Sequence, residues 1–360
     1  MSEDKSILFH TQNYIEDKYE NQYKSTLQVL NDTNNNGKIK DWNGKKKQSL
    51  KLASSYGRLG WKKESQYWIK RSVKVTYCGS VLTFKECLKH GYKKLVHAQF
   101  CKDRLCPMCN WRRSRMLSKQ VIDILHSSSK KKKMDFLFLT LTVKNCHGKD
   151  LNDTIKSMFL AFNKFFKYKS IDDITIGYVR ALEVTRNKRT GEFHPHFHVL
   201  IGVSRKYFKG ENYIKHSEWV SFWQKALGVD YLPTVNVKKV RPKREGQTIE
   251  AASYETAKYT VKDADFIIED KDGVIDKKNT DEAVYYIAEA LYRRRLIAFG
   301  KLFKEIRKEL KLQDIETDEA DLVGADEIEC KCPICQSGLK EIIYKWNIGI
   351  NNYVKEDKNE

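Results

Sequence analysis

The sequence predicts an α+β protein built around a small antiparallel β-sheet. Three observations support this prediction: an ordered series of strand and helix patterns over residues 134–265, a cysteine-rich basic segment before the series, and a mainly helical pattern after it. Within the series the elements follow the order β-α-β-β-α-β-α. This order matches the split βαβ, or ferredoxin-like, arrangement, in which helices cover one face of the sheet and the other face is free for a site.

Hydrophobic periodicity defines each element of the central series. Residues 135–143 form an apolar run rich in β-branched and aromatic side chains, which predicts a strand, and the apolar residues of 151–167 recur at helical spacing. A turn at 187–191 separates two strand patterns and therefore predicts a hairpin. The predicted elements are strand 135–143, helix 151–167, strands 175–185 and 196–203, helix 217–227, strand 234–240 and helix 249–262.

Composition divides the rest of the chain into three regions. Residues 1–50 are polar and rich in asparagine, as is typical of a flexible leader. Residues 51–130 combine basic helical patterns with five of the nine cysteines, and residues 266–360 are expected to be mainly helical with a cysteine cluster near the end. Helices are predicted here at 51–74, 110–126 and 283–312, with a linker at 127–133.

The net charge of the chain is strongly positive. The 360 residues include 67 Lys and Arg against 47 Asp and Glu, which gives +20 and favours nucleic acid over a membrane surface as the partner. No apolar run approaches the ~18–20 residues of a transmembrane helix, and the polar residues 1–10 do not resemble a signal peptide. We therefore expect an intracellular, reducing environment, in which cysteines are free thiols or metal ligands rather than disulfides.

Three of the nine histidines fall within the five residues 194–198. Because a strand alternates its faces, His196 and His198 point to the same side, where two imidazoles can bind one divalent metal ion. The adjacent strand of the predicted hairpin carries Glu183 as a candidate third ligand, and a carboxylate would admit Mn²⁺ or Mg²⁺. The alternative is a pair of strand histidines that face solvent and bind nothing.

A second constellation lies on the predicted helix 249–262. Tyr259 follows Glu255 by four residues and precedes Lys262 by three, so the three side chains share one helix face. A tyrosine hydroxyl can attack phosphorus and form a covalent intermediate, while Lys262 would steady the phosphate and Glu255 would activate water or transfer a proton. The alternative is that Tyr259 is a packing residue, as most tyrosines are.

These patterns together resemble the replication initiation proteins of rolling-circle plasmids, which belong to the HUH endonuclease superfamily. The resemblance covers about residues 74–265, just over half of the chain. Three motifs in the family's order carry it: FLTLT at 138–142, HPHFHVL at 194–200 and ETAKYTVKD at 255–263. The segment CPMCNWRRS at 106–114 also resembles the family's cysteine stretch.

The resemblance implies a single-tyrosine enzyme that nicks and rejoins DNA at the double-strand origin of a plasmid, in single-stranded or hairpin form. Tyr259 would be joined to the 5′-phosphate, the free 3′-OH would prime synthesis, and Glu255 would activate the water that ends the cycle. His196 and His198 would hold the catalytic Mn²⁺ or Mg²⁺, with Glu183 as our candidate for the third ligand. A host helicase and polymerase are the expected partners in the bacterial cytoplasm, no membrane is involved, and a homodimer is allowed.

The cysteine segment predicts a structural zinc site. Cys101, Cys106 and Cys109 supply three soft ligands, and the last two have the spacing of a metal knuckle. Four thiolates suit Zn²⁺. The alternative is a set of reduced, buried thiols without metal. A fourth ligand is expected from a nearby cysteine or histidine; in order of preference the candidates are Cys78, Cys87, and His90 or His97.

Cations next to this cluster are expected to contact DNA phosphates without reading the base sequence. These cations are Arg104, Arg112, Arg113, Arg115 and Lys119. Further basic runs lie at 130–133, 238–244 and 293–295, and at least one of them is expected to line the DNA groove.

The last cysteines resemble half of a second knuckle. Cys330, Cys332 and Cys335 have no later cysteine or histidine to complete them. The cluster is either incomplete or completed by Cys87 or by a second chain. Cys146, just after the first strand of the central series, is expected to be a buried thiol.

The function has two alternatives to replication initiation. An HUH transposase or mobilisation relaxase would use the same active site on another DNA target. A non-catalytic, zinc-dependent DNA-binding regulator needs the basic surface and the cysteines alone, and it leaves the histidine pair and the tyrosine helix unexplained.

Overall fold

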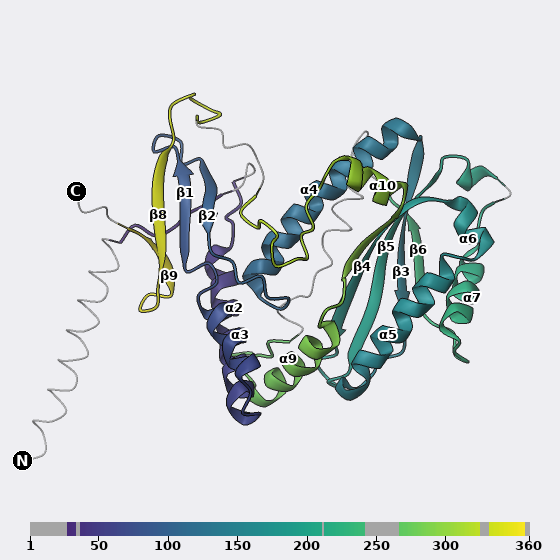
Figure 1. Ribbon diagram of the computed structural model, residues 1–360, viewed down its shortest axis with the longest axis horizontal. Coiled ribbons are helices and arrows are strands. Elements are labelled where there is room, and N and C mark those ends of the chain that lie inside the picture. Colours follow the sequence, from purple (N-terminus) through teal and green to yellow (C-terminus); the bar gives the residue numbers. More distant parts are fainter. Residues whose placement is uncertain (1–26, 34–36, 211, 242–265, 325–330, 357–360) are drawn as a thin grey trace, which may run out of the picture. The chain divides into compact units, whose positions relative to one another are not determined.

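The computed structural model describes residues 27–33, 37–210, 212–241, 266–324 and 331–356. The chain divides into two compact units, each built from separate stretches of sequence (Figure 1). Unit 1 comprises 1–47, 79–99 and 323–360, and unit 2 comprises 48–78 and 100–322. This division differs from the four consecutive regions expected from composition, because strands from the cysteine-rich region and from the C-terminal region pair with each other in unit 1.

Unit 2 contains a five-stranded antiparallel sheet with the strand order β6-β3-β5-β4-β7. Its strands are β3 (Met134–Thr142), β4 (Thr175–Arg186), β5 (Phe193–Ser204), β6 (Val235–Lys239) and β7 (Ile297–Lys301). The first four, including the β4–β5 hairpin, lie within three residues of their predicted ends. The prediction of an α+β protein with an antiparallel sheet is confirmed.

Helices α5 (Gly148–Phe165) and α7 (His216–Leu227) cover one face of this sheet, and the short helix α6 (Lys169–Ile174) leads into β4 (Figure 1). Both covering helices follow the predicted apolar spacing. Phe197 of β5 points to this face, and its ring centroid lies 5.2 Å from that of Phe162 on α5. Because strand side chains alternate, the neighbours of Phe197, His196 and His198, point to the opposite face of the sheet.

Helices of the described residues cover about half of the opposite face, whereas the predicted arrangement left it free. Helices α4 (Pro107–Lys131) and α10 (Leu302–Glu309) pack on the half that contains Phe136 and Phe138 of β3. Two positions further along the same face of β3 the side chain is Thr140. This face of the sheet is therefore apolar and packed near the two phenylalanines and polar from Thr140 onward. The candidate metal ligands lie in the polar half.

Two helix boundaries in the N-terminal part differ from the prediction. Helix α2 (Trp42–Lys62) begins inside the expected leader 1–50, because Trp42 is buried and anchors this end. The predicted helix 51–74 is interrupted: α2 ends at Lys62 and α3 (Gln66–Thr76) starts after a turn in which Glu64 has a φ of 49°. A left-handed residue cannot continue an α-helix.

The predicted linker at 127–133 belongs largely to α4, which continues to Lys131. Serine and lysine do not break a helix, and Ser128 is buried on the packed side of α4. The helix ends where the Lys132 N–H donates to the Ser128 carbonyl. The polar composition of this segment was therefore a poor indicator of its structure.

The predicted helix 283–312 is three elements. Helix α9 (Lys277–Leu291) ends before Arg293, whose φ is 52°, and the chain then forms β7 and α10. Residues of β7 pair with β4, for example Ile297 with Ala181. Pairing with the edge of a sheet replaced the helix because it satisfies the backbone groups of β4 that would otherwise be exposed.

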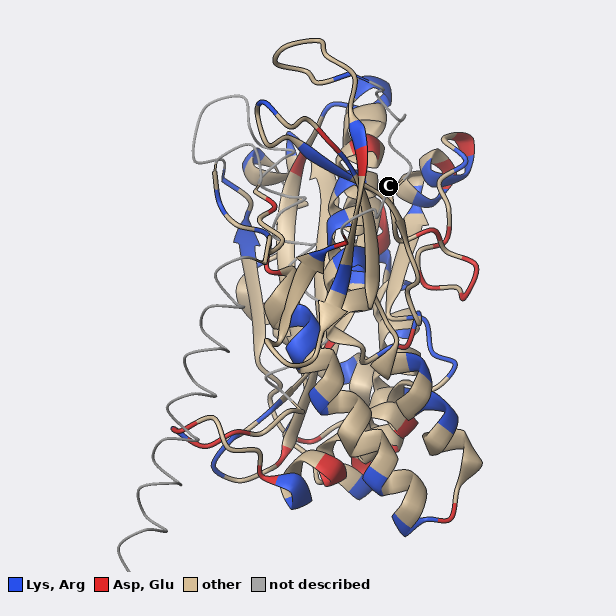
Figure 2. Cartoon of the chain, turned by 90° about the vertical axis from the view of Figure 1, so that its left-hand side faces the viewer, with Lys and Arg blue, Asp and Glu red and all other residues tan. Residues whose placement is uncertain are grey.

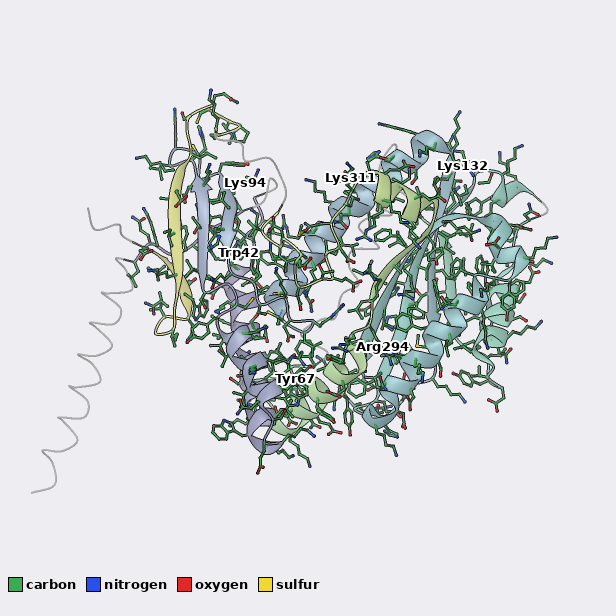
Figure 3. All side chains as sticks on the ribbon, in the orientation of Figure 1. Trp42, Tyr67, Lys94, Lys132, Arg294 and Lys311 are labelled. Atoms are coloured by element: carbon green, nitrogen blue, oxygen red, sulfur yellow. The ribbon has the colours of Figure 1, made fainter. Side chains whose placement is uncertain are left out.

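Unit 1 contains a four-stranded antiparallel sheet with the order β2-β1-β8-β9. Its strands are β1 (Val81–Glu86), β2 (Lys93–Ala98), β8 (Lys340–Asn347) and β9 (Asn352–Lys355). The rings of Trp42, which Figure 3 labels, and Tyr344 pack against Phe84 at centroid distances of 5.7 and 5.8 Å. The expectation of a mainly helical region 266–360 is wrong, because this region also supplies β7, β8 and β9.

Among the helices of the described residues, none combines the length and the apolar content that a membrane span requires. The predicted helix 249–262 lies outside the described residues.

Candidate functional site

The polar half of the sheet in unit 2 brings Glu183, His196 and His198 together. In the β4–β5 register Glu183 is directly opposite His196, and His198 follows two positions later on the same face. The three side chains are buried, with 2%, 8% and 7% of their surface exposed. The alternative of solvent-facing histidines is thereby wrong, and the three side chains share one face of the sheet, as strand alternation predicts.

The hydrogen bonds of the two imidazoles indicate which ring nitrogen faces Glu183. His196 Nδ1 lies 3.0 Å from the His194 carbonyl oxygen, which can only accept, so Nδ1 carries the proton. In a neutral ring the lone pair is then on Nε2, and Nε2 lies 3.2 Å from Glu183 Oε2. His198 Nε2 lies 2.9 Å from the same oxygen. A lone pair facing a carboxylate requires either a proton or a cation between them.

The donor set fits a divalent cation. One ligand atom from each of Glu183, His196 and His198 lies within 4.8 Å of the others, as they would around one ion. Two imidazoles and one carboxylate leave further coordination positions for water or substrate, which distinguishes the set from a closed structural site. This group can therefore hold a metal ion that also contacts a ligand.

Two neighbouring side chains complete the surroundings of the histidines. Thr140 Oγ lies 3.3 Å from His198 Nδ1, so it can accept the proton that fixes the tautomer of this ring. Thr140 lies in the FLTLT segment, whose apolar pattern predicts a strand but no contact with a histidine. His194 Nδ1 lies 2.9 Å from Asn145 Oδ1, and burial, together with the nearby His196, lowers the pKa of His194. His194 therefore belongs to the edge of the site.

The predicted cysteine site is assembled in unit 2. Cys78 follows α3, Cys101 precedes α4, and Cys106 and Cys109 lie at the start of α4. The sulfur of Cys109 lies 3.5 Å from that of Cys78 and 3.6 Å from that of Cys101, and the Cys106–Cys78 separation is 3.6 Å. Tetrahedral Zn²⁺ with Zn–S bonds of about 2.3 Å requires sulfur separations of about 3.8 Å. The four thiols can thus hold a metal ion, and Cys78 is the residue that completes the group.

The five cations expected to contact DNA divide into two classes. Arg113 is buried, and its guanidinium donates to the carbonyls of Lys102 and Asp103 in the loop between Cys101 and Cys106. Arg104 forms an ion pair with Glu316 (2.8 Å), and Arg112 donates to the Leu322 carbonyl.

These three arginines therefore hold the loops around the cysteine group, and the expectation that they face DNA does not fit their contacts. Arg115 and Lys119 are exposed and lie four residues apart on one face of α4. They remain the candidates for phosphate contact. Lys and Arg occur on helices, strands and loops throughout the described chain rather than on a single element (Figure 2).

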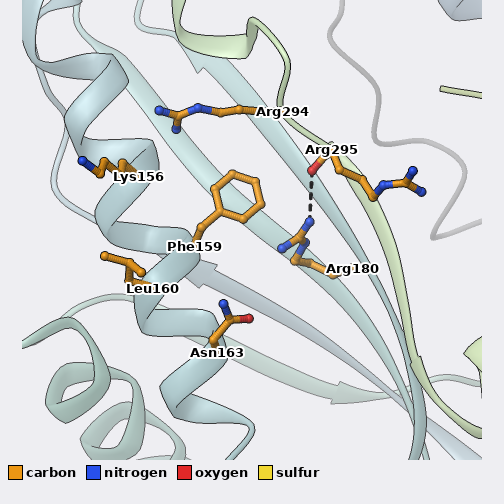
Figure 4. Close-up of a pocket in the computed structure, with 7 residues that line it drawn as sticks. All are labelled: Lys156, Phe159, Leu160, Asn163, Arg180, Arg294 and Arg295. Atoms are coloured by element: carbon orange, nitrogen blue, oxygen red, sulfur yellow. Dashed lines mark hydrogen bonds between the residues drawn. The ribbon is translucent and has the colours of Figure 1, made fainter. Parts of the chain in front are cut away.

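A basic cavity of about 410 Å³ lies on the helix-covered face of the sheet in unit 2 (Figure 4). Arg180 is buried there, 4.4 Å from the Phe159 ring, and donates to the Arg295 carbonyl; burial lowers its pKa to about 10. Arg294 donates to Asn152 Oδ1 (2.7 Å), and Arg295 pairs with Asp314. Because Arg180 and Glu183 point to opposite faces of β4, this cavity is not part of the candidate metal centre.

The predicted catalytic residues Tyr259, Glu255 and Lys262 lie outside the described residues. Their helix spacing stays a prediction.

Comparison with known proteins places this chain among replication proteins. A family model described as "Replication protein" matches residues 92–354. The chain is 38% identical to a "Protein rep" of Bacillus amyloliquefaciens over 91% of its own length and 97% of the relative. It is 39% identical to a "Protein rep" of Streptococcus pneumoniae, over 95% and 99% of the two chains. No solved structure matches it.

Proposed function

Since the chain belongs to the plasmid rolling-circle replication proteins, we propose that it initiates replication by nicking the double-strand origin of its plasmid. The nick would be made by Tyr259 beside a divalent metal ion held by Glu183, His196 and His198. The observation that carries the proposal is this buried group of two imidazoles and one carboxylate on the polar half of the sheet. Its ligand set suits an ion that must also contact substrate.

The proposed reaction balances without a further reactant. The Tyr259 hydroxyl attacks the phosphorus of the scissile phosphodiester, a P–O bond to tyrosine forms, and the bond to the 3′-oxygen breaks. The tyrosine proton passes to the leaving 3′-oxygen, through water or Glu255. Attack of a 3′-hydroxyl on the phosphotyrosine reverses these steps and rejoins the strand.

The metal ligands and their neighbours would each have a defined task. A bound ion would polarise the scissile phosphate and stabilise the charge that develops on its oxygens. Glu183 would balance part of the charge of a bound ion, while the His194 carbonyl and Thr140 would hold the two imidazoles in the tautomer that offers Nε2. Lys262 would attract the phosphate toward Tyr259.

The order of the strands supports the HUH form of the ferredoxin-like fold. Strands β6, β3, β5 and β4 are neighbours in this order, and each neighbouring pair is antiparallel. Strand β5 therefore lies between β3 and β4, and strand β3 lies between β5 and β6. This order is the one expected of two interlocked split βαβ units. They place the two histidines on a central strand, where neighbouring strands hold them from both sides.

DNA binding would involve the helix that begins at the cysteine group. We propose that Zn²⁺ bound by the four thiolates fixes the first turn of α4 and so positions Arg115 and Lys119 for phosphates. The origin DNA would be held by such contacts, and polymerase and helicase of the host would act after the nick.

Replication is favoured over transposition or mobilisation because the family model that matches residues 92–354 is described as a replication protein. A regulator without catalysis is less well supported, because it provides no use for the buried Glu183 beside two imidazoles.

A covalent-adduct assay tests the proposal. The protein is mixed with a labelled single-stranded origin oligonucleotide and Mn²⁺, separated on a denaturing gel, and the DNA-bearing peptide is identified by mass spectrometry. We expect an adduct on Tyr259 that disappears with EDTA and in Tyr259→Phe, and persists in the matched control Tyr213→Phe, whose ring is exposed. Salt-sensitive DNA binding without any adduct would favour the regulator instead.

A further inference from the structure

Unit 1 brings together four metal-binding side chains that the proposed function does not use. They are Cys87, His90, Cys332 and Cys335. Cys87 Sγ lies 3.7 Å from His90 Nδ1 and 3.7 Å from Cys335 Sγ, and Cys332 Sγ lies 3.9 Å from His90 Nδ1. Around tetrahedral Zn²⁺ a sulfur and a nitrogen ligand are separated by about 3.6 Å and two sulfurs by about 3.8 Å. The observed separations therefore already match the coordination shell of one ion.

The two ligand pairs lie in turns with the same backbone geometry. In the first turn the Gly91 N–H donates to the Cys87 carbonyl, and the Cys87 N–H donates to the Tyr92 carbonyl. In the second turn the Gln336 N–H donates to the Cys332 carbonyl, and the Cys332 N–H donates to the Ser337 carbonyl. Residues 87–92 and 332–337 therefore share one pattern of backbone hydrogen bonds.

The residue after each ligand pair has a left-handed backbone. Gly91 has a φ of 64° and Gln336 a φ of 59°. Glycine adopts this conformation at little cost, but a glutamine in it costs of order 1 kcal/mol and is retained only where its surroundings demand it. The turn at Cys332 is therefore shaped for the position of its two sulfurs.

The burial of the ligands suits a structural site. Cys87 and Cys332 are buried, Cys335 is half-buried, and His90 closes the group on the exposed side. Four protein ligands leave no open position for substrate, unlike the group formed by Glu183 and the two histidines.

We propose that Cys87, His90, Cys332 and Cys335 bind one structural Zn²⁺ ion. The ion joins the turn between β1 and β2 to the turn that precedes β8, and the ligands Cys87 and Cys335 are 248 positions apart in the chain. The ion would stabilise the sheet of unit 1 by linking these two turns. Cys332 and Cys335 would thus obtain their two missing ligands, Cys87 and His90, from the same chain.

Metal content of the full-length protein tests the proposal. After washing with a weak chelator that removes Mn²⁺, we expect two zinc ions per chain, one at each cysteine-containing group. Cys332→Ser should contain one, Cys106→Ser should contain one, and Cys146→Ser should still contain two, because Cys146 belongs to neither group among the described residues. One zinc per chain in the wild type, unchanged in Cys332→Ser, would overturn the proposal.

Cobalt spectra keep the test valid if Cys332→Ser does not fold. Replacing Zn²⁺ with Co²⁺ gives absorption bands whose position depends on the number of thiolate ligands. His90→Cys should keep two metal ions and shift the bands toward those of a four-thiolate site, whereas His97→Ala, a variant at an exposed histidine of β2, should leave them unchanged. An unshifted spectrum in His90→Cys, or thiol titration that finds Cys87 and Cys335 in a disulfide, would contradict the assignment.

Discussion

Two ligand groups of unit 2 are held by different elements and offer different chemistry. The cysteine group lies where loops meet the ends of α3 and α4, and its four sulfurs leave no open coordination position. The group of Glu183, His196 and His198 lies on adjacent β-strands and leaves coordination positions open. A closed site stabilises loops that have little core of their own, whereas an open site needs a rigid sheet to hold its ligands. Substitutions in the cysteine group should therefore lower mainly stability, whereas substitutions in the group of Glu183 and the two histidines should lower mainly activity.

The largest effect is expected from Cys106→Ser. Cys106 is fully buried and directly precedes α4, so the loss of one thiolate should release the zinc ion and lower the free energy of unfolding by at least about 4 kcal/mol. Thermal unfolding followed by circular dichroism measures this change. The control Cys146→Ser should change stability by less than about 1.5 kcal/mol; equal stability of the two variants would mean that the cysteine group holds no structural ion.

His198→Ala should strongly reduce the nicking rate and change stability only slightly. The metal-dependent nicking rate should fall by about 10³-fold, because the ion loses a ligand and the scissile phosphate loses its polarisation. Stability should change by only about 1 kcal/mol, since β3 and β4 on both sides hold the strand. Single-turnover nicking and thermal unfolding measure the two quantities, with His97→Ala as the control. Global unfolding of His198→Ala would remove the distinction between the two groups.

Thr140→Val tests how the sheet orients its ligands. Valine keeps the shape but cannot accept the proton of His198 Nδ1, so we expect apparent Mn²⁺ affinity to fall by about 10- to 100-fold. High Mn²⁺ should restore the nicking rate, and Thr140→Ser should retain the normal affinity. The Mn²⁺ dependence of nicking separates this positioning effect from a loss of activity at every metal concentration, which would contradict it.

The smallest effects are expected on α4. Arg115→Ala and Lys119→Ala should weaken DNA binding uniformly over sequences, and each should reduce the slope of log affinity against log salt by about 1. Arg113→Ala should instead lower stability, because its guanidinium holds the loop at Lys102 and Asp103. Fluorescence anisotropy at several salt concentrations makes this measurement. An unchanged salt slope in Arg115→Ala would exclude this face of α4 from the interface.

Local sequence patterns predicted the elements whose partners are close in the chain. The hairpin that contains Glu183 and His196 follows from strand alternation and one turn. The pair Cys106 and Cys109 follows from knuckle spacing, and Cys78 was the preferred candidate for the fourth ligand. Patterns failed where distant segments decide the structure. Residues 297–301 were expected to continue a helix, and they form a strand that pairs with the edge of β4.

Distant pairing also explains the sites that the sequence left open. Cys332 has its ligand partners in a turn about 240 positions earlier, and nothing in its own neighbourhood identifies His90. Arg113 looks like a DNA-binding residue in sequence, yet its guanidinium is buried against loop carbonyls. Local spacing predicts which residues share a face, whereas tertiary contacts decide which cations stay exposed.

The most direct test of the account measures nicking and zinc content on the same samples of wild type and His198→Ala. Origin oligonucleotide cleavage is followed with and without Mn²⁺, and zinc is counted per chain. We predict equal zinc content in both proteins and Mn²⁺-dependent cleavage in the wild type alone. Mn²⁺-dependent cleavage at the normal rate by His198→Ala would show that the metal centre lies elsewhere.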